Sequence, residues 1–114
     1  MSFQKQTLYN YDSELDILHI YSAKIEGGIK GCISIGDYNI DIGQDNSVVG
    51  IEIEQASKLL QVDEDGLNNL DEVRLIVRKV SNLLFIGFIT IKNKKESMIQ
   101  FSIPYNKAQI NLTN

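Results

Sequence analysis

VVGIEIEQASKLL, residues 48–60, is the stretch of sequence that decides the fold. In residues 49–54, β-branched side chains alternate with glycine or glutamate, the period of two that places apolar groups on one face of a β-strand. After this alternation ends, Ala56, Leu59 and Leu60 follow the spacing of a helix. A strand that runs directly into a short helix is therefore predicted, and the rest of the chain must pack against the apolar face of that strand.

Strand patterns recur on both sides of this stretch. The predicted strands cover residues 15–21, 33–42 and 48–54 in the first half and residues 73–80, 83–91 and 97–105 in the second. The apolar phase of the second strand changes near Gly36, where we expect a bulge or kink. Turn-forming residues 43–47 predict a hairpin onto the strand at 48–54. The acidic segment 61–72 is interpreted as a connector with at most a short helix around residues 67–71, and Pro104 should end the last strand or place it at an edge.

Strands that follow one another through short turns indicate antiparallel pairing. We therefore predict a mainly β (α+β) fold, an antiparallel meander sheet of about six strands with one short helix after the third strand. A length of 114 residues fits a single domain, residues 1–114, with a strand-hairpin-helix half at 11–60 and a three-strand half at 73–105. The tail, residues 106–114, carries no recognisable element.

Two of the predicted strands, at residues 15–21 and 83–91, are largely apolar on both faces. In so small a domain one of these faces needs a cover that the chain itself does not supply. A second copy of the chain is the expected cover, so the sequence predicts a homo-oligomer and a role in protein–protein contacts.

The net charge of -4, from 15 acidic and 11 basic residues, does not favour binding to nucleic acid or to an anionic membrane surface. Lys92, Lys94 and Lys95 are the local exception, so weak nucleic-acid binding through them is an alternative to a solvated hairpin tip. The sequence has one cysteine, no apolar signal core at its start and no apolar run long enough for a bilayer. A cytoplasmic protein without membrane contact is expected.

The sequence lacks the GxSxG, HExxH, CxxC and Walker motifs, and we expect no cofactor and no metal. A binding or assembly module is favoured over an enzyme. The alternative is a small metal-dependent or acid–base enzyme that uses Asp16, Glu52 and His19, which requires these side chains to converge. A pair formed by Cys32 and His19, the only cysteine and the only histidine, is a further nucleophilic alternative.

Two segments carry a family pattern. YDSELDILHI at residues 11–20 and VGIEIEQAS at residues 49–57, with Ile40-Asp41-Ile42 between them, resemble the small prokaryotic family called domain of unknown function 2283. The motif residues are Tyr11, Asp12, Asp16, Asp41, Gly50, Glu52, Ala56 and Ser57. The resemblance covers residues 11–60 and implies a strand-hairpin-helix module with no settled biochemical activity. His19 stands where tyrosine is common in the family, and residues 61–114 extend beyond the family core.

Proteins of this family can be encoded beside toxin-like partners. By association, the resemblance implies an antitoxin-like or partner-binding role for the chain.

Overall fold

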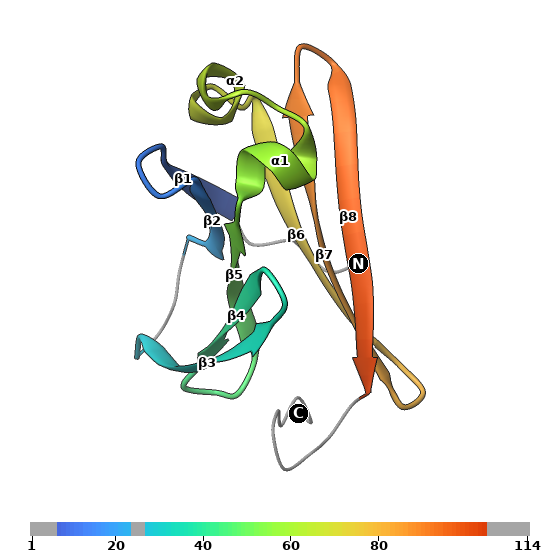
Figure 1. The fold of residues 1–114 in the computed structure, drawn as a ribbon. Coiled ribbons are helices and arrows are strands. Elements are labelled where there is room, and N and C mark those ends of the chain that lie inside the picture. The colour runs from blue at the N-terminus through green and yellow to red at the C-terminus, as the bar shows by residue number, and fades with distance from the viewer. Residues whose placement is uncertain (1–6, 24–26, 105–114) are drawn as a thin grey trace.

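The computed structural model describes residues 7–23 and 27–104, which form eight strands and two short helices (Figure 1). The strands are β1 (Thr7–Asp12), β2 (Ile17–Ser22), β3 (Ile29–Ile35), β4 (Tyr38–Gly43), β5 (Val48–Glu54), β6 (Glu72–Val80), β7 (Leu83–Lys92) and β8 (Lys95–Pro104). The helices α1 (Ala56–Leu60) and α2 (Glu64–Asn68) lie between β5 and β6 in the sequence. Within these residues, no helix is long and apolar enough to cross a membrane.

The strands form two antiparallel sheets. The first half of the chain makes a five-stranded sheet in the order β1-β2-β5-β4-β3, and the second half makes a three-stranded sheet in the order β6-β7-β8. The decisive strand β5 is the centre of the larger sheet, where Ile51 lies between Ile20 of β2 and Ile40 of β4. All three of these isoleucines are fully buried. The apolar face of β5 therefore anchors the core, as its alternation predicts.

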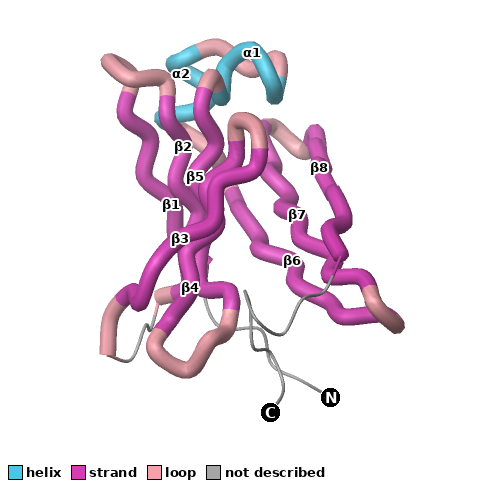
Figure 2. The backbone as a smooth tube through the Cα atoms, turned by 60° about the horizontal axis from the view of Figure 1, so that its bottom comes forward, coloured by secondary structure: helices cyan, strands magenta, loops and turns pink. Residues whose placement is uncertain are grey.

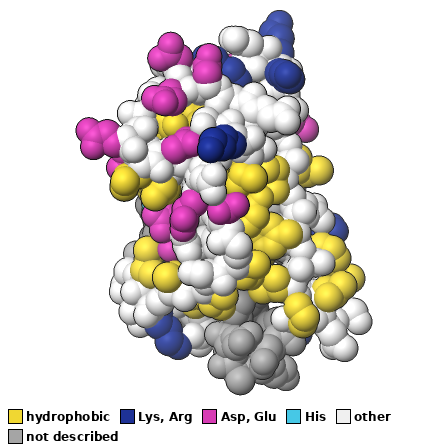
Figure 3. Space-filling model, in the orientation of Figure 1, with side chains coloured by type: hydrophobic (Ala, Val, Ile, Leu, Met, Phe, Trp, Pro, Cys, Tyr) yellow, Lys and Arg dark blue, Asp and Glu magenta, His cyan; other side chains and the backbone are white. Residues whose placement is uncertain are grey.

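The sheets form two layers that enclose one hydrophobic core, and both helices lie at one end of the layers (Figures 1 and 2). From the smaller sheet, β7 contributes the fully buried Leu84, Ile86 and Phe88. Edge strand β1 contacts β6, which joins the two layers on one side. On the other side, Tyr38 of β4 stacks on Phe101 of β8 with ring centroids 4.8 Å apart. In Figure 3, hydrophobic side chains run down the middle of the molecule, while acidic side chains lie over the helical end and over the larger sheet.

The predicted single meander of six strands with one short helix is wrong: the described residues form two antiparallel sheets, of five and three strands, and two short helices. Two local differences account for the two additional strands. First, no strand is predicted before residue 15, because on the edge strand β1 only alternate residues, such as Tyr9 and Tyr11, face the core. Second, the change of phase near Gly36 is a hairpin turn between β3 and β4 and not a bulge within one strand. Gly36 adopts a φ of 58°, a left-handed conformation that glycine enters without steric cost.

Other predictions are confirmed. Residues 43–47 turn the chain from β4 into β5, and β5 continues into α1 after the single residue Gln55. The three strands of the second half form the β6-β7-β8 meander, and β8 ends at Pro104 on the edge of the sheet. The connector contains a helix, but α2 begins earlier than expected, because Asp63 accepts a hydrogen bond from the backbone N–H of Gly66 and caps its first turn. The tail at 106–114 lies outside the described residues.

Candidate functional site

The outward face of the five-stranded sheet carries His19, Asp41 and Glu52, three of the polar side chains that the family pattern or the enzyme alternative names. His19 of β2 lies opposite Glu52 of β5, and Asp41 of β4 lies opposite Gly50 of β5. His19 and Asp41 meet diagonally across β5, with His19 Nε2 and Asp41 Oδ2 2.8 Å apart. The aspartate side chain is 7% exposed and the histidine side chain 28% exposed. The pair is thus accessible mainly from the imidazole side.

Gly50 makes this diagonal contact possible. A Cβ atom at this position would lie 2.8 Å from Asp41 Oδ2, 3.1 Å from the backbone oxygen of Ile20 and 3.2 Å from Tyr21 Cβ. Any larger residue would push the carboxylate away from His19. This explains why the motif has a glycine at position 50: the Asp41 carboxylate occupies the space that a side chain would need.

The polar face continues beyond this pair. Ser34 Oγ donates to Asn39 Oδ1 at 2.6 Å, and Asn39 Nδ2 donates to Glu54 Oε2 at 2.8 Å. A histidine held by a carboxylate can act as a general base, because the carboxylate fixes the orientation of the ring. Within residues 7–23 and 27–104, however, no group of three or more His, Cys, Asp or Glu side chains could hold a metal ion. The face can hydrogen-bond a polar partner surface, and it offers one oriented imidazole.

Asp16 belongs to a different cluster, at the corner where β2 begins and α1 starts. Its Oδ1 accepts hydrogen bonds from the Tyr11 hydroxyl at 2.7 Å and from the Ser57 backbone N–H at 3.0 Å. Its Oδ2 accepts one from the Ser57 hydroxyl at 2.7 Å. The backbone carbonyl of Asp16 also accepts a bond from the N–H of Ala56, 3.0 Å away. One aspartate thus ties β1 and the first turn of α1 to the start of β2.

The electrostatics of this corner follow from its hydrogen bonds. Burial of Asp16 favours its neutral form, but the bonds from Tyr11 and Ser57 outweigh burial and lower the pKa of the carboxyl below its usual value. Burial, together with the bond to Asp16, raises the pKa of the Tyr11 hydroxyl well above its usual range. Asp16 is therefore a permanent acceptor and Tyr11 a permanent donor at neutral pH. This is the behaviour of a structural link and not of a group that exchanges protons.

Most of the family-motif residues thus hold the corner together. Tyr11, Asp16 and Ser57 form the hydrogen-bonded link, and Ala56 is fully buried beneath it. Asp12 accepts bonds from the backbone N–H groups of residues 14 and 15 and shapes the β1–β2 turn. The remaining motif residues, Asp41, Gly50 and Glu52, lie on the polar outward face.

The structure does not bring the trio of Asp16, Glu52 and His19 together. His19 is beside Glu52 on the sheet, but Asp16 is engaged with Tyr11 and Ser57 at the corner. Sequence reasoning missed the partner of His19, which is Asp41. The signal that could have found it is the glycine at position 50, since a glycine inside a strand often marks a close approach by another group.

Two further alternatives can be placed. Cys32 is exposed on β3, and two strands separate it from His19 on β2, so these two residues do not form a nucleophilic pair.

The three lysines near the β7–β8 turn differ in their surroundings. Lys92 Nζ donates to the backbone oxygen of Asn69 at 2.7 Å, and Lys92 and Lys95 line a pocket, whereas Lys94 is on the turn itself. All three lysines lie at one hairpin, and weak nucleic-acid binding through them stays a prediction.

Comparison with known proteins agrees with the pattern of motif residues. The family model described as "Protein of unknown function (DUF2283)" matches residues 8–57. The chain belongs to this family. An uncharacterised protein of Methanocaldococcus jannaschii, MJ0789, is 31% identical over 96 residues, which cover 82% of this chain and 81% of the relative. No solved structure matches the chain.

The family model ends at residue 57, which confirms that residues 61–114 extend beyond the family core, whereas the match to the archaeal relative reaches further along the chain. Because it spans 82% of the chain, it includes much of the region after residue 60. Much of the second half of the chain is therefore similar in sequence to that relative.

Proposed function

We propose that this chain is a protein-binding module that acts through the outward face of its three-stranded sheet, and that a second copy of the chain covers this face. The apolar character of the face is the observation that carries the proposal. The outward side chains of β7 are Leu83, Phe85, Ile89 and Ile91, with Gly87 between them, and they are flanked by Ile76 and Val80 of β6 and Met98 of β8. We call these apolar residues the β7 face.

The β7 face lies on the opposite side of the sheet from the hydrophobic core. The core takes the alternate residues of the same strands, such as Leu84, Ile86 and Phe88. Three large hydrophobic side chains of this face are exposed to solvent: Met98 is 58% exposed, Val80 48% and Leu83 41%. A contiguous apolar patch of this kind on a small protein marks an interaction surface.

The surroundings of the β7 face favour a second copy as its cover. Charged side chains of this surface lie on its edge strands, while the outward side chains of the central strand β7 are all apolar. On β6, Arg74 and Arg78 alternate with Ile76 and Val80, and Arg74 donates to Glu72 on the same edge strand. An apolar centre with a polar rim is the usual composition of an interface. A two-fold axis places the same patch on both partners, so the β7 faces of two copies would cover each other, and two sheets pack face to face about 10 Å apart.

Light scattering during size-exclusion chromatography tests the proposal directly. The wild-type chain should elute with the mass of a dimer, and the double variant Leu83→Lys, Met98→Lys should elute as a folded monomer, since both side chains are already exposed within one chain. Leu59→Lys is the matched control, because Leu59 is 37% exposed on α1 and away from the β7 face. It should leave the dimer intact.

A strictly monomeric wild-type chain at every concentration would reject the homo-oligomer. A foreign protein, such as the toxin-like partner that the family resemblance implies, would then be the remaining occupant of the β7 face. Capture experiments with the wild-type chain and the double variant would identify it. A partner that binds both proteins equally would refute the assignment of the face altogether.

A further inference from the structure

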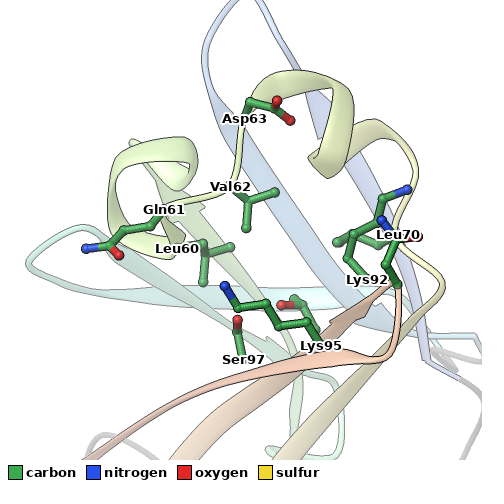
Figure 4. A pocket seen from close by; sticks show the side chains of 10 residues that line it. Leu60, Gln61, Val62, Asp63, Leu70, Lys92, Lys95 and Ser97 are labelled. Carbon is green, nitrogen blue, oxygen red and sulfur yellow. The ribbon is translucent and has the colours of Figure 1, made fainter.

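We propose that a pocket at the helical end of the sandwich binds a small organic anion, a monocarboxylate with a short apolar body. The pocket lies between the α1–α2 connection and the β7–β8 hairpin (Figure 4). It has a volume of about 530 Å³, within the range of small-molecule sites. This inference goes beyond the protein-binding function and does not depend on it, since the pocket contains none of the residues of the β7 face.

Thr90 is the first observation that indicates a ligand. It lines the pocket from β7, where it interrupts an otherwise apolar series of core-facing residues, and it is only 3% exposed. Its hydroxyl makes no hydrogen bond with any residue in the described part of the chain. Every fully enclosed side-chain nitrogen or oxygen atom among these residues does have a partner, so the Thr90 hydroxyl must reach the open space of the pocket. It is available there as both donor and acceptor.

The second observation is an unpaired positive charge. In Figure 4 the Lys95 side chain extends into the pocket beside Ser97, toward Leu60. Its ammonium group has no hydrogen bond or ion pair with any described residue. In contrast, the ammonium of Lys92, which also lines the pocket, is already engaged with a backbone carbonyl.

The acidic residue of the lining does not neutralise this charge. The Asp63 carboxylate caps α2 by accepting from the Gly66 N–H at 2.7 Å, and in Figure 4 it is directed away from Lys95. The pocket thus presents a free ammonium and two hydroxyl groups, from Thr90 and Ser97, within a protein whose formal net charge is -4. These groups are suited to a carboxylate, which accepts hydrogen bonds only.

The apolar part of the lining selects the body of the ligand. Leu60 and Leu70 are 7% and 8% exposed, and Val62 completes the apolar wall opposite the hairpin. The half-buried Val62 and the small exposed parts of Leu60 and Leu70 are the apolar surface that a short alkyl or aryl group would cover and a bare inorganic anion would not. The expected ligand therefore has its carboxylate at Lys95 and its apolar body against α1 and the connection to α2.

A heteronuclear NMR titration of the intact, isotopically labelled chain tests this assignment. Hexanoate is the probe, with hexanol as the uncharged analogue and inorganic phosphate as the anion without an apolar body. Hexanoate should shift the amide signals of Gln61, Thr90, Lys95 and Ser97 in a saturable manner. Hexanol and phosphate should each bind at least about tenfold more weakly, because hexanol lacks the negative charge and phosphate lacks the apolar body.

Lys95→Gln and Lys94→Gln form a matched pair of variants on the same turn. Lys95→Gln should weaken hexanoate binding at least about tenfold, whereas Lys94→Gln should not, since Lys94 is not part of the lining. Thr90→Val should also weaken binding, because it removes the hydroxyl and keeps the volume. Absence of saturable shifts with hexanoate, equal shifts with hexanol, or equal loss in both lysine variants would overturn the proposal. Light scattering on the same samples reports the oligomeric state separately, so failure here is distinguishable from failure of the β7-face dimer.

Discussion

Replacement of Asp16 should destabilise the whole fold. The substitution Asp16→Ala removes the acceptor of three hydrogen bonds, two from Ser57 and one from the Tyr11 hydroxyl. It also places alanine at a φ of 54°, in the left-handed region that aspartate and asparagine tolerate better. Both effects act at the corner that joins β1, β2 and α1, so the loss should be global and not confined to a loop.

The magnitude follows from these contacts. A hydrogen bond to a charged group contributes about 1.5–3 kcal/mol, and the left-handed backbone costs alanine about 1 kcal/mol. Water can replace part of the lost bonding at this half-buried site, so we expect Asp16→Ala to lower the free energy of unfolding by about 3–4 kcal/mol. Asp16→Asn keeps the backbone preference and one acceptor oxygen, and should cost about 1–2 kcal/mol.

Urea denaturation followed by circular dichroism measures these differences. The midpoint should fall while the dependence on urea concentration stays constant, and the melting temperature should fall by about 4 °C for each kcal/mol. Glu14→Ala is the control, an exposed carboxylate in the same turn, and should change stability by less than about 0.5 kcal/mol. If Asp16→Ala costs no more than this control, the corner is not the structural link that we describe.

The same carboxylate gives a pH dependence with a definite sign. The pKa of Asp16 is lowered in the folded state, so its stabilisation is fully present above the ordinary aspartate pKa of about 3.9 and is lost as the pH falls through the folded value. The stability difference between wild type and Asp16→Asn should therefore be constant near neutral pH and shrink in strong acid. A difference that stays the same down to strong acid would contradict the role of the ionised carboxylate.

Three further changes test other parts of the fold by the same denaturation measurement. Gly50→Ala should destabilise by about 1–3 kcal/mol because its Cβ would lie 2.8 Å from a carboxylate oxygen, whereas Gly31→Ala, with no heavy atom within 4 Å of the added Cβ, should be close to neutral. Asp63→Ala should cost about 1 kcal/mol through loss of the α2 cap, and Asp65→Ala, in the same turn but without the capping bond, should cost less. Leu67→Ala should cost about 2–5 kcal/mol since this side chain of α2 is fully buried; a cost below 1 kcal/mol would show that α2 is not part of the core.

The parts of the fold that could be predicted are the segments whose apolar residues follow a single clear period, either that of a strand or that of a helix. The alternation in residues 49–54 and the helical spacing that follows it specify β5 and α1 without reference to the rest of the chain. The three strands of the second half have the same property. In contrast, β1 is an edge strand whose pattern resembles a polar turn, and the order β1-β2-β5-β4-β3 places β5 beside β2 by long-range pairing. Local patterns carry no information about such a partner.

In the candidate sites, too, groups marked by a sequence motif could be predicted, whereas contacts between distant segments could not. The family motif identified Tyr11, Asp16 and Ser57 as a group, and the structure shows why, since they bond to one another. The contact between His19 and Asp41 depends on two residues 22 positions apart and on the space above the glycine between them. The pocket depends on the folding of the β7–β8 hairpin toward the helices, and nothing in the local sequence around Thr90 indicates that its hydroxyl faces open space.

The location of the motif residues also bears on what this family member does. Tyr11, Asp16 and Ser57 of the motif stabilise the corner of β1, β2 and α1, so these motif residues report the fold. The β7 face and the pocket both lie beyond residue 57, outside the region that the family model matches. Chimaeras that exchange only the second half of the chain between family members should therefore transfer the proposed binding together with it.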